Sequence, residues 1–510
     1  MNFQKKNKPI RLLQTVCVVC LAFFFCQSCV EESFIHSSDA KLDFSTDTVC
    51  FDTVFATIPT VTLEFRVYNK NSKAVVVDRI WLKGGEQSLF RFNVDGYSAK
   101  TNELKDLTIS AGDSMFVFIE TTLKESGEAN PVYTVDELMF ESNGNTQAIT
   151  LEAYGQDAVI LKGYSLRDNE TFTAEKPYLI FDFLHIPRGK TLTVEAGAKL
   201  YFHKSKSKML ATQSGQVQLD NTSIVVEGDI KLQGTYSNRI TLRGDRFDLA
   251  YTNVLYSYMP SQWGGIYLLG ENGHNEIVCA DIVGAENALQ LFGGASLKIP
   301  LELSNSTIHC SGGYGIYALY GKMKIWNTEI SNCGKSCILQ MGGDMQLTHS
   351  TLANYLPAYL NGGQARKEPA LNIVSYMEAN ENIVAYPIGS AVVENSIIFG
   401  NQQIELGLRD TTLGIPFNIF ISDCLIKSKP IERAELLNIL WSKDGVNDVF
   451  VQPSSDFDNI DESGYFDFSL SEGSMAIGKA NRKVSELYPQ DILGRNRLKD
   501  VHPDLGAYEK

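Results

Sequence analysis

Apolar and polar residues alternate in short runs along the first part of the chain, and these runs predict β-strands. Four of them are VTLEFRVYN (61–69), AVVVDRIWL (74–82), MFVFIETTL (115–123) and AITLEAYG (148–155). The runs are rich in β-branched and aromatic residues and are separated by Asn, Gly and Ser, which is the strand pattern of an all-β sandwich. We therefore predict a β-sandwich over residues 41–158.

From residue 159 onward the hydrophobic pattern repeats itself. Five segments align without gaps: LELSNSTI (301–308), MKIWNTEI (323–330), MQLTHSTL (345–352), AVVENSII (391–398) and IFISDCLI (419–426). Their third and eighth positions are aliphatic, and the steps between them are 22, 22, 46 and 28 residues. We interpret the step of 46 as two turns of the repeat, because repetition at a fixed period is typical of a solenoid.

A repeat of this length built from short strands predicts a right-handed parallel β-helix over residues 159–510. Solenoids of helix pairs need 33 residues or more per repeat, whereas β-helix turns stack at about 4.8 Å and place equivalent positions above one another. We expect the fifth position to form a structural ladder at a bend, in which side-chain amides bond to the residues above and below. That position holds Asn305, Asn327, His349, Asn395 and Asp423.

Two family resemblances agree with this organisation. LEFRVYNKNS, ISAGDSMFVFIETTL and LMFESNGNTQAITLEAYG resemble the hydin-type immunoglobulin-like domain, with Ala111-Gly-Asp in place of its Pro-Gly-Asp turn. VEAGAKLYF, GTYSNRITLRGD, WGGIYL and the ending DILGRNR…HPDLGAYE resemble β-helix lipoproteins of the pectin-lyase-like superfamily. The resemblances imply an all-β fold, with an N-terminal immunoglobulin-like β-sandwich followed by a right-handed parallel β-helix.

The N-terminus resembles a bacterial lipoprotein signal peptide over residues 1–28. A basic start precedes an apolar run over 12–25, which is shorter than the roughly 20 residues that span a bilayer. Cys29 is the expected lipidation site, although Cys26 stands where Leu is usual; a Cys26–Cys29 redox pair is the alternative. Residues 29–40 are an acidic linker, and its Glu31-Glu32 resembles the export tag of Bacteroidota-type surface lipoproteins. This implies a lipid anchor in the outer membrane and exposure to the cell exterior.

Charge and cysteine usage exclude several function classes. The formal net charge is −15, and no basic run follows the signal peptide, so we predict no nucleic-acid partner. Beyond Cys29, six cysteines remain in the mature chain, which is too few for a disulfide scaffold. These six cysteines include no CxxC pair and therefore do not suggest a zinc site, so we predict no metal and no cofactor.

Evidence for catalysis in the sequence is limited to two acids. The chain lacks the DD pair and the Gly-His-Gly of polygalacturonases. Asp281 and Glu329 both precede the last position of their repeat unit, so they are expected in one column, two turns apart. Two carboxylates on one face are candidates for general acid and base, but a separation near 10 Å is just beyond the range of an inverting pair. An exposed acidic ladder is the alternative.

Ligand-binding candidates come from two places. Trp263 precedes a Gly-Gly pair and is either a sugar-stacking platform or the cap of a coil. Arg366 and Lys367 lie between Leu352 and Ala391, where the repeat register breaks. Solenoids place such insertions on one face, often the binding face; a longer coil with a solvated turn is the alternative.

Three functional interpretations remain compatible with the sequence. The first is a surface lipoprotein whose β-helix binds a polysaccharide or another surface protein. The second is a polysaccharide lyase or glycoside hydrolase with an atypical site. The third is a purely structural surface protein. The missing catalytic motifs favour binding or adhesion, since fold analogy alone does not establish an activity.

Overall fold

The computed structural model describes residues 33–128, 130–251, 254–270, 273–379, 382–442, 448–454 and 466–510. The predicted signal peptide, Cys29 and the acidic pair that follows lie outside these residues. The chain divides into two compact units, residues 1–156 and 157–510. The predicted all-β fold class, with a sandwich followed by a parallel β-helix, is confirmed. No described helix is long and apolar enough to cross a membrane.

The first unit is a sandwich of two five-stranded sheets. One sheet has the order β1 (Asp43–Phe44), β3 (Leu63–Tyr68), β8 (Ser114–Thr121), β5 (Phe90–Val94) and β6 (Tyr97–Ser98). The other has the order β2 (Thr48–Phe55), β10 (Asn145–Gln156), β9 (Val132–Ser142), β4 (Val75–Leu82) and β7 (Glu103–Ile109). All neighbours are antiparallel except β2 and β10, which run parallel. Alternate residues of the strands fill one apolar core, as the alternating pattern requires.

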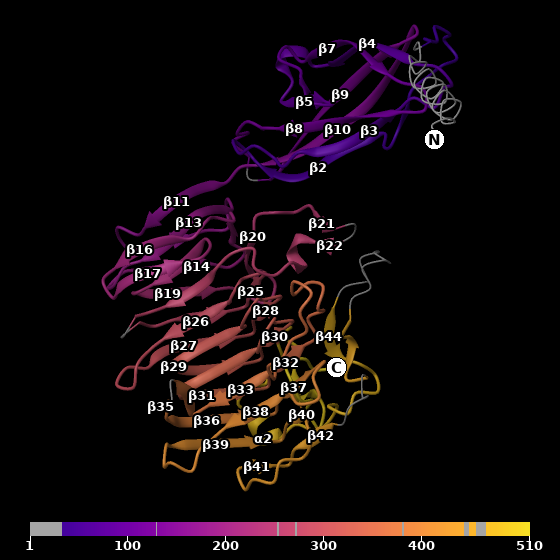
Figure 1. Ribbon diagram of the computed structural model, residues 1–510. Coiled ribbons are helices and arrows are strands. Elements are labelled where there is room, and N and C mark those ends of the chain that lie inside the picture. Colours follow the sequence, from indigo (N-terminus) through magenta and orange to yellow (C-terminus); the bar gives the residue numbers. More distant parts are fainter. Residues whose placement is uncertain are drawn as a thin grey trace, which may run out of the picture. The chain divides into compact units, whose positions relative to one another are not determined.

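The second unit winds through three parallel sheets, which we call sheets I, II and III in their order along each coil (Figure 1). Sheet I contains β18 (Ser223–Val226), β23 (Gly265–Leu268), β26 (Leu289–Phe292), β33 (Leu371–Val374) and β38 (Leu406–Arg409). Sheet II contains β12 (Glu170–Phe172), β14 (Thr191–Glu195), β19 (Asp229–Gln233), β24 (Glu276–Val278), β27 (Ile299–Ser304), β36 (Ile388–Glu394), β39 (Phe417–Ser422) and β41 (Leu436–Leu437).

Sheet III contains β15 (Lys199–Phe202), β20 (Ile240–Gly244), β25 (Ala280–Val283), β28 (Thr307–His309), β30 (Glu329–Ser331), β32 (Thr351–Asn354), β37 (Ile397–Gly400), β40 (Leu425–Lys427) and β42 (Leu440–Ser442). Four long strands bend between sheets. The strands β11 (Val159–Ser165) and β13 (Tyr178–Ile186) pass from sheet III to sheet I. The strands β29 (Ile316–Trp326) and β31 (Ile338–Thr348) pass from sheet I to sheet II.

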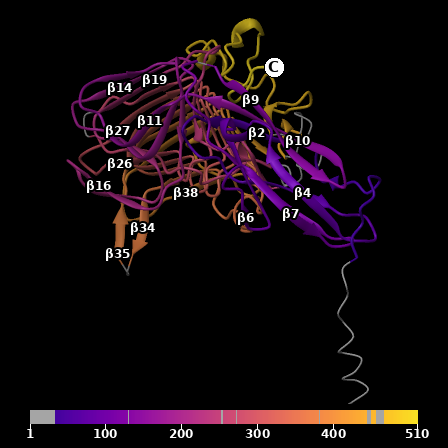
Figure 2. The ribbon, with the colours of Figure 1, turned by 90° about the horizontal axis from the view of Figure 1, so that it is seen from above.

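The last residues of the five repeat units stack in direct register, as predicted. Ile308 pairs with Ile330, which pairs with Leu352, and the column continues to Ile398 and Ile426. The interpretation of the 46-residue step as two turns is wrong, because Leu352 pairs directly with Ile398. The extra residues form a loop and the hairpin of β34 (Tyr376–Ala379) and β35 (Asn382–Ala385), which projects from the β-helix in Figure 2.

The predicted ladder residues all lie at the corner between sheets II and III. Each has a left-handed backbone, with φ between 45° and 51°, a conformation that Asn and Asp tolerate better than most residues. Asn327 donates to Asn305 at 3.2 Å, and Asn395 bonds to His349 at 3.0 Å. No bond joins Asn327 to His349 among the described contacts; Asn327 instead bonds to the C-terminal segment. Backbone geometry is therefore a second reason for Asn at this corner.

The three outer faces of the β-helix are covered to different extents. The C-terminal segment packs on sheet III through an apolar cluster that includes Phe399, Phe450 and Leu505; it contains β43 (Phe450–Gln452), β44 (Asp467–Leu470), α2 (Arg482–Ser485) and η3 (Arg497–Lys499). The hairpin β16 (Lys208–Thr212) and β17 (Gly215–Leu219) packs on sheet I over Val225. Four short elements remain. The first unit contains η1 (Gly85–Gln87), and the second contains β21 (Leu249–Tyr251), β22 (Val254–Leu255) and η2 (Tyr256–Tyr258).

Candidate functional site

The two acids predicted as an acid and base pair do lie in one column, with Thr307 between them. Both are engaged by other groups of the protein. Asp281 accepts hydrogen bonds of 2.8 to 3.0 Å from Arg239. Glu329 is buried beneath the C-terminal segment and accepts from Ser331 at 2.6 Å and from the Tyr508 hydroxyl.

Burial therefore removes Glu329 from any role at the surface. Its removal from water raises the pKa of its carboxyl, although the bonds from Ser331 and Tyr508 act in the opposite direction. A carboxylate in this place cannot reach a polysaccharide. Both the catalytic prediction and the alternative of an exposed acidic ladder are wrong for Glu329, because residues more than 170 positions away in the sequence cover it.

Trp263 is not a sugar-stacking platform, because its side chain is fully buried in the β-helix. The indole stacks on Phe202, with ring centroids 4.0 Å apart and planes inclined by 6°, and its Nε1 donates to the Val283 carbonyl at 2.9 Å. The glycines that follow admit the neighbouring coil: a Cβ on Gly265, whose φ is 102°, would lie 1.8 Å from the Asn287 carbonyl oxygen. Trp263 therefore belongs to the core.

The two basic candidates of the insertion are separated by the structure. Arg366 is buried and forms an ion pair of 2.5 Å with Glu405, whose side chain is also fully buried. A binding role for Arg366 is therefore wrong, since no ligand reaches it. Lys367 is exposed. Of these two adjacent residues, one side chain is therefore buried and the other is exposed to solvent. The sequence pattern did not predict this difference.

Three aromatic side chains, Tyr267, Phe292 and Tyr317, lie on the outer face of sheet I. Together with Tyr314, which precedes β29 on the same coil as Tyr317, we call them the aromatic strip. Successive ring centroids are 6.0, 5.8 and 5.5 Å apart. The strand register sets the row, because Tyr267 pairs with Gln290 and Gln290 with Tyr317. Phe292 is 37% exposed, and the three tyrosines are half-buried. The strip thus offers several ring surfaces along the β-helix axis.

Polar groups border the aromatic strip and hold its rings in place. The Tyr314 hydroxyl donates to Glu368 at 3.1 Å, and the ammonium group of Lys335 lies 5.0 Å from the centre of the Tyr314 ring. Partial burial raises the pKa of Tyr267, Tyr314 and Tyr317. Their hydroxyls therefore stay protonated near neutral pH and keep both donor and acceptor capacity.

This arrangement suits an extended ligand with apolar faces and polar edges. Aromatic rings present large rigid surfaces, and tyrosine adds a polar group at the ring edge. Sugar rings have faces of C–H groups and edges of hydroxyls, which match such a row. Sequence analysis missed the strip; the available signal was Gly-Ile-Tyr at 265–267 and again at 315–317, whose last residue points outward from sheet I.

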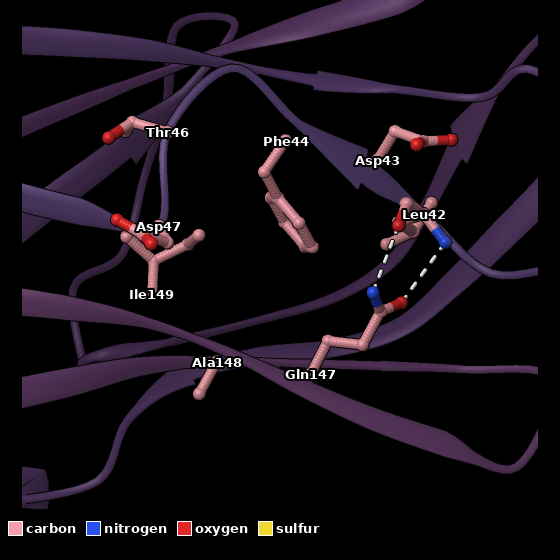
Figure 3. Close-up of a pocket in the computed structure, with 8 residues that line it drawn as sticks. All are labelled: Leu42, Asp43, Phe44, Thr46, Asp47, Gln147, Ala148 and Ile149. Carbon is pink, nitrogen blue, oxygen red and sulfur yellow. Dashed lines mark hydrogen bonds between the residues drawn. The ribbon is translucent and has the colours of Figure 1, made fainter.

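Shallow hollows lined by described residues lie elsewhere, including one on sheet II and one on the sandwich. The first, of about 630 Å³, is lined by mixed charges that include Glu302, Lys324 and Asp344. The other, of about 560 Å³, lies at an edge of the sandwich (Figure 3). There the Gln147 side-chain amide accepts from the Leu42 N–H at 3.0 Å and donates to the Leu42 carbonyl at 2.9 Å. These two bonds resemble the pair that a neighbouring strand would make with Leu42. Neither hollow gathers convergent catalytic groups.

Metal and thiol chemistry receive no support within the described part of the chain. No group of three or more His, Cys, Asp or Glu side chains is placed there to hold a metal ion. The six described cysteines are free thiols, five of them buried. Cys310 donates to the Tyr258 carbonyl at 2.7 Å rather than bonding to Cys333.

Comparisons with known proteins do not identify a family. No protein-family model matches the chain, and no curated protein matches it significantly. A solved family 123 glycoside hydrolase from Clostridium perfringens, studied for glycolipid glycan hydrolysis, is 7% identical over 23% of this chain and 26% of its own, with a TM-score of 0.17. PapD-like domain 7 of human CEP192 is 10% identical over 25% of this chain and 92% of its own, also with a TM-score of 0.17. Scores this low carry no argument about fold or function.

Proposed function

We propose that the β-helix binds a polysaccharide along the aromatic strip of sheet I. The proposal is based on the row of four rings, three of them on the outer face of sheet I, with successive centroids 5.5 to 6.0 Å apart. The net charge of −15 disfavours polyanions through long-range repulsion, so the expected ligand is a neutral or weakly charged glycan. The burial of Glu329 removes the basis for a paired-acid hydrolase.

Tyr317→Ala is expected to weaken glycan binding about 5- to 30-fold, because a central aromatic contact is worth roughly 1–2 kcal/mol. Affinity electrophoresis against a panel of neutral plant, algal and host polysaccharides would identify the ligand, and calorimetry would then measure both affinities. Tyr97→Ala is the matched control, since Tyr97 is a 62% exposed tyrosine of the sandwich. Equal binding by the wild type and the Tyr317 variant would refute the site.

We also propose that the protein is a surface lipoprotein, in which the sandwich holds the β-helix away from the outer membrane. The basic start, the apolar run over 12–25, and Ser28 before Cys29 support a lipid anchor. The sandwich sequence motifs support an immunoglobulin-like spacer. Cys29→Ser is expected to move the chain from the membrane fraction to the soluble fraction, whereas Cys26→Ser leaves it in membranes. Recovery of the wild-type chain without lipid would contradict the anchor.

A further inference from the structure

Three side chains from three successive coils form a hydrogen-bonded series at the N-terminal end of sheet I. Ser165 ends β11, His185 lies in β13, and Glu227 follows β18. Ser165 Oγ lies 2.9 Å from His185 Nδ1, and His185 Nε2 lies 3.1 Å from Glu227 Oε2. Strand register brings Ser165 and His185 together, since they are paired residues of β11 and β13.

The acid at the end of this series is firmly positioned. The Glu227 side chain is fully buried and accepts from the Ser214 N–H at 2.6 Å, the Ser214 hydroxyl at 2.7 Å and the Gln213 N–H at 3.0 Å. Burial acts to raise the pKa of Glu227, but the bonds from Ser214, Gln213 and His185 outweigh it, and the pKa is lowered. Glu227 is therefore an ionised carboxylate near neutral pH.

An ionised carboxylate fixes the tautomer of His185. A carboxylate only accepts hydrogen bonds, so Nε2 of His185 carries the ring proton. The lone pair of Nδ1 then faces Ser165 Oγ and can accept the hydroxyl proton. His185 is 7% exposed, whereas Ser165 is exposed to solvent. This is the order nucleophile, base and orienting acid, with the nucleophile at the surface.

The backbone at Ser165 offers a donor for a developing oxyanion. Leu166 donates its N–H to the His185 carbonyl at 2.9 Å. Because N–H groups alternate in direction along an extended strand, the N–H of Ser165 points to the other edge of β11. Among the described strands of the β-helix none pairs with that edge, since β11 is the first in the order. The backbone N–H of the nucleophile itself is a known type of oxyanion donor.

We propose that Ser165, His185 and Glu227 form a serine-ester hydrolase site. Ser165 Oγ attacks the carbonyl carbon of an ester, and its proton passes to His185 Nδ1. The bond to the alcohol oxygen breaks, the alcohol leaves with that proton, and the acyl group stays on Ser165. Water then gives a proton to His185 Nδ1, and its oxygen bonds to the acyl carbon. The bond between the acyl carbon and Ser165 Oγ breaks, the carboxylic acid leaves, and the proton returns from His185 Nδ1 to Ser165 Oγ. The products are one carboxylic acid and one alcohol from one ester and one water.

The place of the site on sheet I points to an acylated glycan as substrate. One outward column runs from Ser165 through His185 and Val225 to Tyr267. The hairpin β16–β17 covers Val225 in the middle of this column, so a glycan bound on the aromatic strip reaches Ser165 by passing beside the hairpin. At about 4.8 Å per coil, the nucleophile lies about 14 Å from the first ring of the aromatic strip. This substrate class rests on the proposed glycan binding, whereas the ester hydrolysis does not.

Ester hydrolysis is tested without any glycan. The full chain is treated with a fluorophosphonate probe, the modified peptide is mapped by mass spectrometry, and turnover of p-nitrophenyl acetate is measured. We expect modification at Ser165 and a loss of turnover of at least about 100-fold in Ser165→Ala, with no change in Ser207→Ala, a second exposed serine of the β-helix. An unmodified Ser165, or turnover that Ser165→Ala leaves unchanged, overturns the proposal.

Glu227 is a positioning residue, because it acts through His185. Its role is tested by a measurement that would not change if Glu227 had a purely structural role. Glu227→Gln keeps the side-chain volume but loses the charge that fixes the tautomer of His185. We expect kcat to fall at least about 10-fold with KM unchanged. The thermal midpoint is expected to fall as well, because the amide nitrogen of Gln cannot accept the N–H and O–H groups that one carboxylate oxygen accepts. An unchanged kcat in a folded variant shows that Glu227 only anchors the hairpin β16–β17, and it overturns the triad.

The substrate class is tested with acetylated xylan and acetylated mannan, following released acetate. We expect release by the wild type and loss of release in both Ser165→Ala and Tyr317→Ala, with the fluorophosphonate reaction retained in Tyr317→Ala. Release that Tyr317→Ala does not affect refutes the aromatic strip but leaves the hydrolase site standing. If p-nitrophenyl acetate is hydrolysed but neither polysaccharide releases acetate, the proposal of a glycan substrate is wrong. The proposal of an ester hydrolase site then still holds.

Discussion

Arg366→Ala is expected to destabilise the β-helix by about 3–5 kcal/mol, because it leaves a buried carboxylate without its charge partner. The Arg366 guanidinium donates to both oxygens of Glu405, at 2.9 and 2.5 Å. It also donates to the Asn354 carbonyl at 3.0 Å and to Asn401 at 2.9 Å, which joins the insertion to the neighbouring coils. The desolvation of Glu405 raises the pKa of its carboxyl even with Arg366 present, so the cost of losing Arg366 is large.

Urea unfolding of the two variants Arg366→Ala and Lys367→Ala provides the comparison. Lys367 is adjacent, has the same charge and is exposed, so its loss is expected to change the unfolding free energy by less than about 0.5 kcal/mol. Replacing both members, as Arg366→Met with Glu405→Leu, is expected to recover most of the loss, because an apolar pair removes the unpaired charge. Equal effects of Arg366→Ala and Lys367→Ala would contradict this account.

Arg497→Ala is expected to release the C-terminal segment from the β-helix, with a loss of about 3–5 kcal/mol in its docking. Arg497 is fully buried and donates to Glu509 at 3.2 Å, to the Ala507 carbonyl at 2.9 Å and to Asn327 of the corner column at 3.3 Å. Glu509 and the Ala507 carbonyl also accept the backbone N–H groups of Asp504 and Ile492, at 3.2 and 3.0 Å, but neither of these donors carries a charge. The substitution leaves Glu509 buried without its positive partner.

Amide hydrogen exchange over residues 466–510 would show this release directly. Lys499→Ala is the control, since Lys499 is exposed and lies two positions further along. Arg497→Lys is expected to behave like the alanine variant, because an ammonium group cannot make the divergent bonds of a guanidinium. Exchange that stays slow in Arg497→Ala would show that the apolar cluster around Phe450 and Leu505 holds the segment by itself.

The same contacts explain the motif that is most specific in the sequence. In D-x-x-G-x-x-R, Asp491 accepts from the N–H groups of Leu493 and Arg495 at 2.9 and 2.7 Å, and Gly494 takes a φ of 80° that closes the turn. In D-x-G-A-Y-E, Glu509 donates its N–H to Asp491 at 2.9 Å. The two halves of the ending thus bind each other and hold Arg497 against the ladder corner. Their role is structural, and it requires no ligand.

Little of the candidate site was predictable. The sequence placed Asp281 and Glu329 in one column because both belong to recognisable repeat units. It did not show that Tyr508 covers Glu329 or that Glu405 pairs with Arg366, since these partners lie 179 and 39 residues away. Ser165 and His185 belong to the first coils, where the repeat is irregular and register cannot be counted. The aromatic strip was not recognisable in the sequence for two reasons. Gln290 occupies the column position between Tyr267 and Tyr317, and the strands that carry the rings are unequally spaced along the chain.

The sequence by itself determined the architecture. Backbone hydrogen bonding sets a constant rise per coil, so a short repeat with fixed aliphatic positions specifies parallel strands, an apolar interior and a column of left-handed corners. Only the tertiary structure decided which outward side chains meet solvent. That depends on segments that return from far along the chain, such as the C-terminal segment over sheet III. The sequence pattern records the face on which a residue lies, but it does not record what covers that face.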